Sequence, residues 1–309
     1  MNSIVCLKQV PDTEAQIRIK PDGSDVLLQD VKFIINPYDE FGVEEALKQK
    51  EKFGQGAVTI VCLGPERSVE SIRTALAMGA DKAVHLDDPA LDGGDAFTTA
   101  RALAEQIKGM EYDIIFCGKQ SIDDDAAQVG VALAEYLNIP HANLVIKVEV
   151  ASDKKKVKVN RQIVGGEEVL EIPLPAVITC QKGLNEPRYA SLPGIMKAKK
   201  KEVKAVKAAD LKLDAAAIGA AGARSKINKC YAPPQRKAAQ IIAGETPEQK
   251  AAALVKLLRE EAKAIQHDWQ KKELIKHRSF YKGEKKWEKE FGYSQSLAKL
   301  RSEKLLLRY

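Results

Sequence analysis

The sequence lacks any segment of the kind that crosses a membrane or directs export. No apolar run approaches the roughly 18 residues that a membrane-spanning helix requires. The first ten residues, MNSIVCLKQV, lack the basic region, the long apolar core and the cleavage site of a signal peptide. We therefore expect a cytoplasmic protein that is not integral to a membrane.

Cysteine and histidine are too few and too scattered to predict a metal site. The five cysteines form no CxxC pair, and none of the four histidines has a metal-ligand spacing to a cysteine. Four cysteines fall in apolar runs typical of strands, and these are Cys6, Cys62, Cys117 and Cys180. We expect reduced, buried thiols and no metal.

Two glycine-rich nucleotide motifs are also missing. No G-x-G-x-x-G follows the first apolar run, and no G-x-x-x-x-G-K-[ST] occurs anywhere. Neither a dinucleotide fingerprint nor a P-loop is therefore present, and a bound nucleotide must be held by another arrangement.

What is present indicates a folded α/β protein. The 309 residues are 45% hydrophobic and 30% charged, as expected of a globular chain. In the first half, short apolar runs alternate four times with helix-forming segments. This alternation predicts an open, mainly parallel twisted sheet with helices on both faces, in the manner of Rossmann-like folds. Alternating runs at 145–150 and 156–162 predict an antiparallel hairpin at the sheet edge.

The stretch from Phe116 to Val131, FCGKQSIDDDAAQVGV, reads as a strand, a turn and the start of a helix. Ligands of open α/β sheets bind at the carboxyl ends of the strands, and a helix N-terminus favours anionic groups. A phosphate-bearing ligand is therefore one interpretation. The three aspartates, 123–125, would repel a phosphate beside them, and one of them is expected to be the N-cap of the helix. A well-capped helix without a ligand is the other interpretation.

A segment of different character runs from Leu184 to Lys201, LNEPRYASLPGIMKAKKK. Its prolines and glycine disfavour a regular helix in the first part. Leu184 beside basic residues suggests an apolar side chain that docks into a partner's acid-rimmed pocket. Alternatively, Leu184 and Ile195 pack underneath an ordered crossover loop.

Four segments together resemble the β subunit of electron transfer flavoprotein. They are, in order, VKFIINPYDEFGVEEALKQKEK, SIRTALAMGADKAVHL, GKQSIDDDAAQVG and LNEPRYASLPGIMKAKKK. The resemblance covers about residues 1–236. It implies an electron carrier rather than an enzyme, paired with an α subunit that holds most of the FAD, with AMP buried in this subunit. It further implies electrons arriving from acyl-CoA dehydrogenases of fatty acid oxidation and leaving to a quinone oxidoreductase.

The resemblance also implies which residues contact AMP. All of them lie around one crevice, at or just after the carboxyl ends of the predicted parallel strands. Tyr38 would in addition lie near the flavin of the α subunit. The predicted contacts are Cys6, Asn36, Pro37, Tyr38, Asp39, Leu63, Gln120, Ser121, Ile122, Asp123, Asp124, Asp125, Ala126, Ala127, Gln128, Val129, Gly130 and Val131. No catalytic acid or base is implied.

Residues 184–201 match the family's recognition loop, with Leu184 as the leucine that anchors it in the dehydrogenase and 197–201 as its basic run. The predicted partner contacts are Leu184, Asn185, Glu186, Pro187, Arg188, Tyr189, Ile195, Met196 and Lys197.

Some family members bifurcate electrons from NADH and hold a second FAD where others hold AMP. Their motif resembles I-D-G-D-T-A-Q-V-G-P, whereas this chain has Asp124 in place of the glycine and Val131 in place of the proline. Because a side chain in place of glycine restricts a bulkier ligand, AMP is favoured here.

The chain divides into a predicted nucleotide-binding domain, 1–235, and a C-terminal arm, 236–309. A helix is expected from Thr246 to about Ile265, followed by an unusual extension rich in aromatic and basic residues. Although the net charge is only +6, lysine and arginine crowd this extension. It is expected to lie on the α subunit. Peripheral membrane docking and a nucleotide-sensing or nucleic-acid-binding role are the alternatives.

Overall fold

The computed structural model describes residues 1–234 and 239–264 of the chain. These belong to two compact units, 1–233 and 234–309, which are treated separately. The predicted extension after residue 265 lies outside the described residues. Within the described residues, no helix is both long and apolar enough to cross a membrane.

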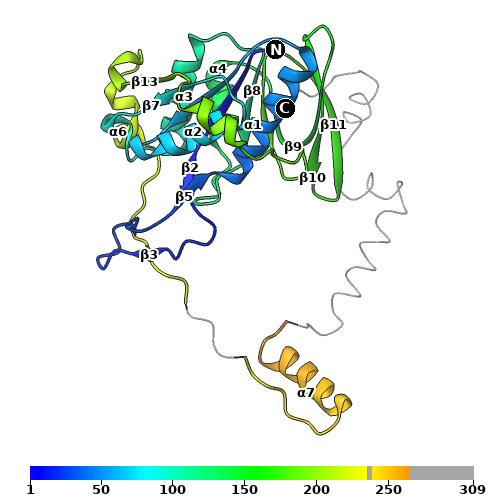
Figure 1. The fold of residues 1–309 in the computed structure, drawn as a ribbon. Coiled ribbons are helices and arrows are strands. Elements are labelled where there is room, and N and C mark those ends of the chain that lie inside the picture. The colour runs from blue at the N-terminus through cyan, green and yellow to red at the C-terminus, as the bar shows by residue number, and fades with distance from the viewer. Residues whose placement is uncertain (235–238, 265–309) are drawn as a thin grey trace, which may run out of the picture. The chain divides into compact units, whose positions relative to one another are not determined.

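The first unit is built on a nine-stranded sheet (Figure 1) in the order β11-β10-β9-β12-β8-β1-β6-β7-β13. Its strands are β1 (Ser3–Leu7), β6 (Val58–Leu63), β7 (Lys82–Leu86), β8 (Ile114–Gly118), β9 (His141–Val150), β10 (Lys156–Ile163), β11 (Gly166–Pro173), β12 (Ala176–Cys180) and β13 (Val203–Val206). Each pair of adjacent strands from β9 to β13 in this order is parallel. The two remaining pairs, β9 with β10 and β10 with β11, are antiparallel. The predicted fold class is confirmed.

Two small antiparallel pairs lie outside the main sheet. Strand β2 (Gln9–Pro11) pairs with β5 (Phe33–Ile35), and β3 (Arg18–Ile19) pairs with β4 (Val26–Leu27). The second pair is a hairpin whose turn contains Gly23 at φ +73°, a conformation that glycine adopts without strain.

Helices cover both faces of the main sheet because its central strands are apolar on both sides. The helices are α1 (Pro37–Phe53), α2 (Val69–Met78), α3 (Ala96–Lys108), α4 (Val129–Leu137), α5 (Leu192–Ala198) and α6 (Gly219–Gly222), with short 3-10 turns η1 (Glu66–Ser68), η2 (Pro89–Leu91), η3 (Ala208–Asp210) and η4 (Ala215–Ala217). Residues of α1, α2 and α5 join one buried cluster, and residues of α3 and α4 join the other. Successive residues of β1 alternate between the clusters: Val5 faces the first, whereas Ile4 and Cys6 face the second.

The second unit contributes one described helix, α7 (Pro247–Glu260). The Thr246 hydroxyl accepts a hydrogen bond from the Gln249 N–H, and Pro247 occupies the first helical position. The helix therefore starts where the sequence predicts. Proline is favoured at this position because an N–H group there would have no partner within the helix.

The start of α3 supplies a test of the fold's local stability. One oxygen of Asp95 accepts from the N–H groups of Phe97 and Thr98, and the other accepts from those of Arg224 and Ser225. Replacing Asp95 with alanine removes the N-cap and is expected to lower the free energy of unfolding by about 1–2 kcal/mol. Denaturant unfolding measures this loss. Asp92→Ala, at an exposed loop position, is the matched control and should change stability by less than about 0.5 kcal/mol.

Candidate functional site

The candidate site, called the crevice below after the sequence prediction, is at the carboxyl ends of β1 and β8, next to the first turn of α1 and the loop that leads into α4. From the sequence, residues 36–39 are expected to form a break before a helix that starts at Gly42, whereas α1 begins at Pro37. The difference arises because Pro37 is preorganised for the first helical position. Tyr38 and Asp39 therefore lie in the first helical turn and not in a loop before it.

Asp39 joins the two central strands at this edge. Its carboxylate accepts the backbone N–H of Lys8, just past β1, at 2.7 Å, and that of Gly118, the last residue of β8, at 2.9 Å. Gly118 must be glycine here, since an added Cβ would come within 2.3 Å of an Asp39 oxygen. Burial raises the pKa of Asp39 to about 7, although its hydrogen bonds act in the opposite direction.

Asn36 connects α1 to the loop after β8. Its side-chain amide donates to the Gln120 carbonyl at 2.9 Å, and its oxygen accepts from the Ile122 N–H at 3.2 Å. Asn36 is almost fully buried. Buried amides of this kind fix the relative position of the segments that they link, so the loop from 120 to 122 is held against the start of α1.

The three aspartates do not cap α4 as the sequence predicted. The helix begins at Val129 with Gln128 as its N-cap and no side-chain cap hydrogen bond. Asp124 instead accepts from the Ser121 hydroxyl at 2.7 Å and from the Ala126 N–H at 3.0 Å. These bonds close a turn before the helix starts. The aspartates of this turn are therefore not placed to accept from the first N–H groups of α4.

Lys8 is the main site residue that sequence reasoning missed. Its ammonium lies 2.8 Å from an oxygen of Asp123 and 3.1 Å from one of Asp124. Burial alone would raise the pKa of the Asp124 carboxyl, but its hydrogen bonds and the nearby Lys8 charge hold that pKa below its usual value. A lysine directly after the first strand was the available signal. Lys8 offsets part of the negative charge that would otherwise repel an anion at the crevice.

The backbone that enters α4 has an unusual conformation. Asp125 and Ala127 have φ angles of +52° and +55°, which are uncommon for residues with a side chain and occur most often at functional sites. The first N–H groups of α4 have no partner within the helix, and no side chain caps them. A turn of this kind before an uncapped helix is suited to bind an anion.

The close approach of α4 to the sheet depends on Gly130. A Cβ at this position would lie 2.8 Å from the Thr179 methyl carbon and 3.3 Å from the Cys117 Cβ. Residues around Gly130 therefore lie directly against the ends of β8 and β12.

Some of the predicted nucleotide contacts are joined to one another by hydrogen bonds, whereas others make only packing contacts. Hydrogen bonds join Asn36 to the loop at 120–122, and Asp39 to the ends of β1 and β8. The Tyr38 ring lies under the Lys119 ammonium, 4.8 Å from its centroid. Leu63 ends β6, the neighbour of β1 on the other side, and packs against the second cluster. Leu63 therefore lies at the carboxyl edge of the sheet, one strand away from β1, and its side chain makes apolar contacts.

The predicted recognition loop is tied to α1 at its root. Arg188 lies 2.7 Å from a Glu44 oxygen and 2.6 Å from a Glu51 oxygen, and the two carboxylates raise its pKa. Asn185 donates to Glu45 and to the Phe41 carbonyl, both at 3.1 Å. Several buried or half-buried polar contacts therefore hold this segment.

Leu184 is not the exposed apolar side chain that the sequence suggested. It is half-buried and packs against the first core cluster. The exposed apolar side chains lie further along, at Tyr189 (97% exposed), Leu192 (76%) and Met196 (60%), with Ile195 at 43%. Leu192, Ile195 and Met196 belong to α5, a short helix in which Ala198 is the buried residue.

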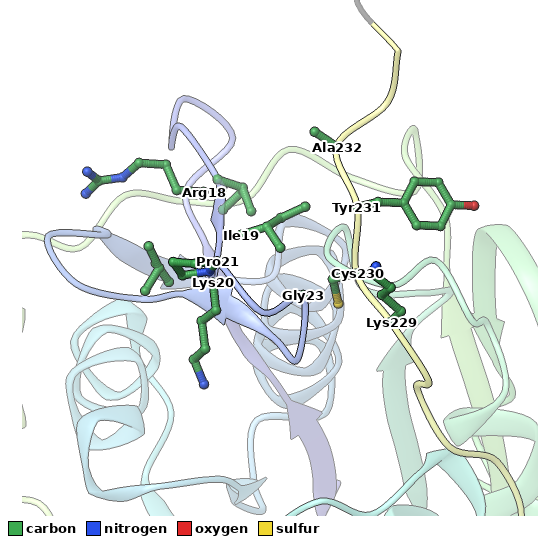
Figure 2. Close-up of a pocket in the computed structure, with 11 residues that line it drawn as sticks. Arg18, Ile19, Lys20, Pro21, Gly23, Lys229, Cys230, Tyr231 and Ala232 are labelled. Atoms are coloured by element: carbon green, nitrogen blue, oxygen red, sulfur yellow. The ribbon is translucent and has the colours of Figure 1, made fainter.

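A second hollow, of about 560 Å³, lies apart from the crevice (Figure 2). Arg18, Ile19 and Lys20 of the hairpin line one side, and the segment from Lys229 to Ala232 lines the other. None of its lining residues belongs to the predicted nucleotide contacts. Among the described residues, no group of three histidine, cysteine, aspartate or glutamate side chains is arranged to hold a metal ion.

Comparison with known proteins decides the family. The family model for the electron transfer flavoprotein domain matches residues 25–211. This chain belongs to the family of electron transfer flavoprotein β subunits. The relative from Thermoanaerobacterium thermosaccharolyticum is 43% identical over 249 residues, which are 80% of this chain and 94% of the relative. The β subunit from Sus scrofa is 41% identical over 256 residues, 82% of this chain and 96% of the relative. That from Bacillus subtilis is 40% identical over 271 residues, 86% of this chain and all of the relative.

Family membership confirms the resemblance stated from the motifs. It places the chain among flavoproteins of electron transport and implies an α-subunit partner. The assignment of individual residues to ligand or partner contacts stays a prediction.

The raised pKa of Asp39 gives a test of the crevice's electrostatics. Its pKa rises from 3.8 to about 7 on folding, so the folded state binds more protons than the unfolded state between these values. The free energy of unfolding contributed by this group must therefore decrease as pH rises from about 4 to about 7. Urea unfolding at pH 5 and pH 8 should show a smaller decrease for Asp39→Asn, which resembles the protonated acid. The same pH dependence in both proteins would contradict the assigned shift.

Proposed function

We propose that this chain is the β subunit of a heterodimeric electron transfer flavoprotein that carries electrons from acyl-CoA dehydrogenase-type flavoenzymes to a quinone oxidoreductase, with AMP as a structural ligand in the crevice. The observation that carries the ligand assignment is the uncapped N-terminus of α4 and the left-handed turn before it. Family membership supports the electron-carrier role.

The phosphate would be held by backbone N–H groups at the start of α4. Ala126 and Ala127 are exposed and small, so little side-chain bulk separates the backbone from a ligand. Helix N-termini favour anionic groups by both hydrogen bonding and the helix dipole. The negative charges of Asp123 and Asp124 are partly balanced by Lys8, which lessens their repulsion of a phosphate.

Asp124 favours AMP over a second, larger flavin nucleotide. Its side chain is engaged by Lys8, Ser121 and the Ala126 N–H, so it takes up space at the turn that a glycine would leave empty. Moving it aside would break these bonds. The electron-bifurcating alternative, with FAD in this crevice, requires that displacement.

The chain's own residues bind and position, and none is assigned an acid–base step. A flavin held mainly by the α subunit would supply the redox chemistry, and this chain would form part of the frame that holds it. Asn36 and Asp39 fix the crevice walls, and bound AMP would add a further link between α4 and the central strands. AMP then stabilises the subunit without reacting.

Residues 184–201 would dock the electron donor. Arg188 and Asn185 fix the root of the loop on α1, while Leu192 and Met196 present apolar side chains to solvent. Three lysines follow, at 197, 199 and 200, and all are exposed. An apolar anchor beside positive charge fits an apolar pocket with an acidic rim.

The nucleotide content of the purified heterodimer tests the ligand assignment. Denaturation is expected to release one AMP and one FAD per heterodimer, as measured by chromatography of the supernatant. Two FAD and no AMP would show that the bifurcating alternative is correct. The absence of any flavin would count against the carrier role itself and favour the nucleotide-sensing or nucleic-acid-binding role.

A pair of leucine variants tests the docking surface. Leu192→Ala is expected to slow electron transfer from an acyl-CoA dehydrogenase at least tenfold with unchanged thermal stability, because it removes an exposed anchor. Leu184→Ala is the matched control, and it should lower the free energy of unfolding by about 1 kcal/mol through lost packing. Unchanged electron transfer by the Leu192 variant with every candidate dehydrogenase would rule out this anchor.

A further inference from the structure

Two cysteines face each other beneath the crevice. Strands β1 and β8 are parallel neighbours in which Val5 pairs with Phe116, so the next residues, Cys6 and Cys117, are adjacent across the two strands. Both belong to the buried cluster on the α3 and α4 side of the sheet. The Cys6 thiol is near enough to raise the pKa of the Cys117 thiol.

The backbone spacing is compatible with a disulfide. Neighbouring strands lie about 4.7–4.9 Å apart, and disulfides join Cα atoms about 4.4–6.8 Å apart. Since both side chains leave the same face of the sheet, the two sulfur atoms approach without a change in strand register. No strand has to move out of the sheet for the bond to form.

The other described cysteines have no comparable neighbour. Cys62 and Cys180 belong to the cluster on the opposite face, and β1 and β8 separate their strands. Cys230 lies in the segment that lines the second hollow. The topology therefore selects a single pair.

This pair adjoins the bonds that shape the crevice. Cys117 directly precedes Gly118, and Cys6 lies two residues before Lys8. The backbone N–H groups of Gly118 and Lys8 both donate to the Asp39 carboxylate. The Cys117 sulfur would also lie 3.6 Å from a Cβ at position 130, where α4 begins its approach to the sheet. A bond between the two sulfurs changes the crevice floor at the position where β1, β8 and α4 meet.

We propose that Cys6 and Cys117 form a reversible dithiol–disulfide pair that oxidises when the crevice is open and is protected when a nucleotide covers it. The protection rests on the proposed AMP site, whereas the formation of the bond does not. Cytosolic disulfides of this reversible kind serve redox sensing rather than stability.

The oxidant is a hydroperoxide such as hydrogen peroxide. Cys6 is 7% exposed and Cys117 is 5% exposed, so we take the Cys6 sulfur as the one that attacks a peroxide oxygen. The O–O bond breaks, one water leaves and Cys6 becomes a sulfenic acid. The Cys117 sulfur then attacks the Cys6 sulfur, and hydroxide leaves with the Cys117 proton as a second water. Each sulfur loses one electron, and the peroxide gains two. An added dithiol then reduces the bond to two thiols by thiol–disulfide exchange and is itself oxidised to a disulfide.

The neighbouring Cys6 thiol and burial raise the pKa of Cys117 well above its usual value. Because the thiolate is the reactive form, we expect oxidation of the pair to be slower than that of an exposed thiol. Covering the crevice should slow it further.

The test uses the full-length chain in its heterodimer. The complex is treated with hydrogen peroxide, either stripped of nucleotide or with saturating AMP, then alkylated and digested for mass spectrometry. A peptide linked through Cys6 and Cys117 is expected in the stripped complex, formed at least fivefold more slowly with AMP and lost after treatment with dithiothreitol. Absence of this linked peptide under both conditions would overturn the proposal. Formation at equal rates would retain the disulfide but count against nucleotide in the crevice.

Serine variants locate the pair. Cys6→Ser and Cys117→Ser should each abolish the linked peptide, whereas Cys62→Ser and Cys180→Ser, at buried positions on the opposite face, should leave it unchanged. If Cys117→Ser fails to fold, Cys6→Ser alone decides. Equal loss of the linked peptide in the Cys62 or Cys180 variants would show that the effect is not specific to the pair.

Discussion

The buried carboxylate of Asp39 is the contact on which the crevice depends. By accepting one N–H from beyond β1 and one from the end of β8, it fixes the two central strands relative to the first turn of α1. Each bond is charge-assisted when the acid is ionised, but burial acts against that charge. The neighbouring Asn36 extends the same helix turn to the loop after β8. One turn of one helix therefore organises three segments that are far apart in the sequence.

Electrostatic balance decides what this crevice can hold. Three consecutive aspartates before a helix would normally exclude an anion. In this chain Lys8 pairs with two of them, while Asp125 accepts a bond from the Gln120 side chain. The helix N-terminus is left without a capping side chain. A phosphate group can then use the backbone donors that the aspartates do not use.

Much of the fold was predictable because the central parallel strands are buried on both faces. Mostly apolar runs such as 58–63 and 82–86 can be recognised locally, and their alternation with helices predicts a parallel sheet. The site was less predictable. The aspartates looked like helix caps because capping depends on residue type, but the turn at Asp124 and Ala126 uses their oxygens before the helix starts. Lys8 and Thr179 were missed because only the folded sheet brings them beside residues more than 40 positions away. Leu184 and Leu192 look alike in sequence, and only packing distinguishes the half-buried residue from the exposed one.

The central claim is that the start of α4 binds the phosphate of a nucleotide. The most direct measurement compares the affinities of AMP and adenosine for the nucleotide-stripped heterodimer by calorimetry. The account predicts that AMP binds at least a hundredfold more tightly, because only AMP engages the N–H groups of the uncapped helix. Equal affinities would show that the crevice does not recognise phosphate and would contradict the account.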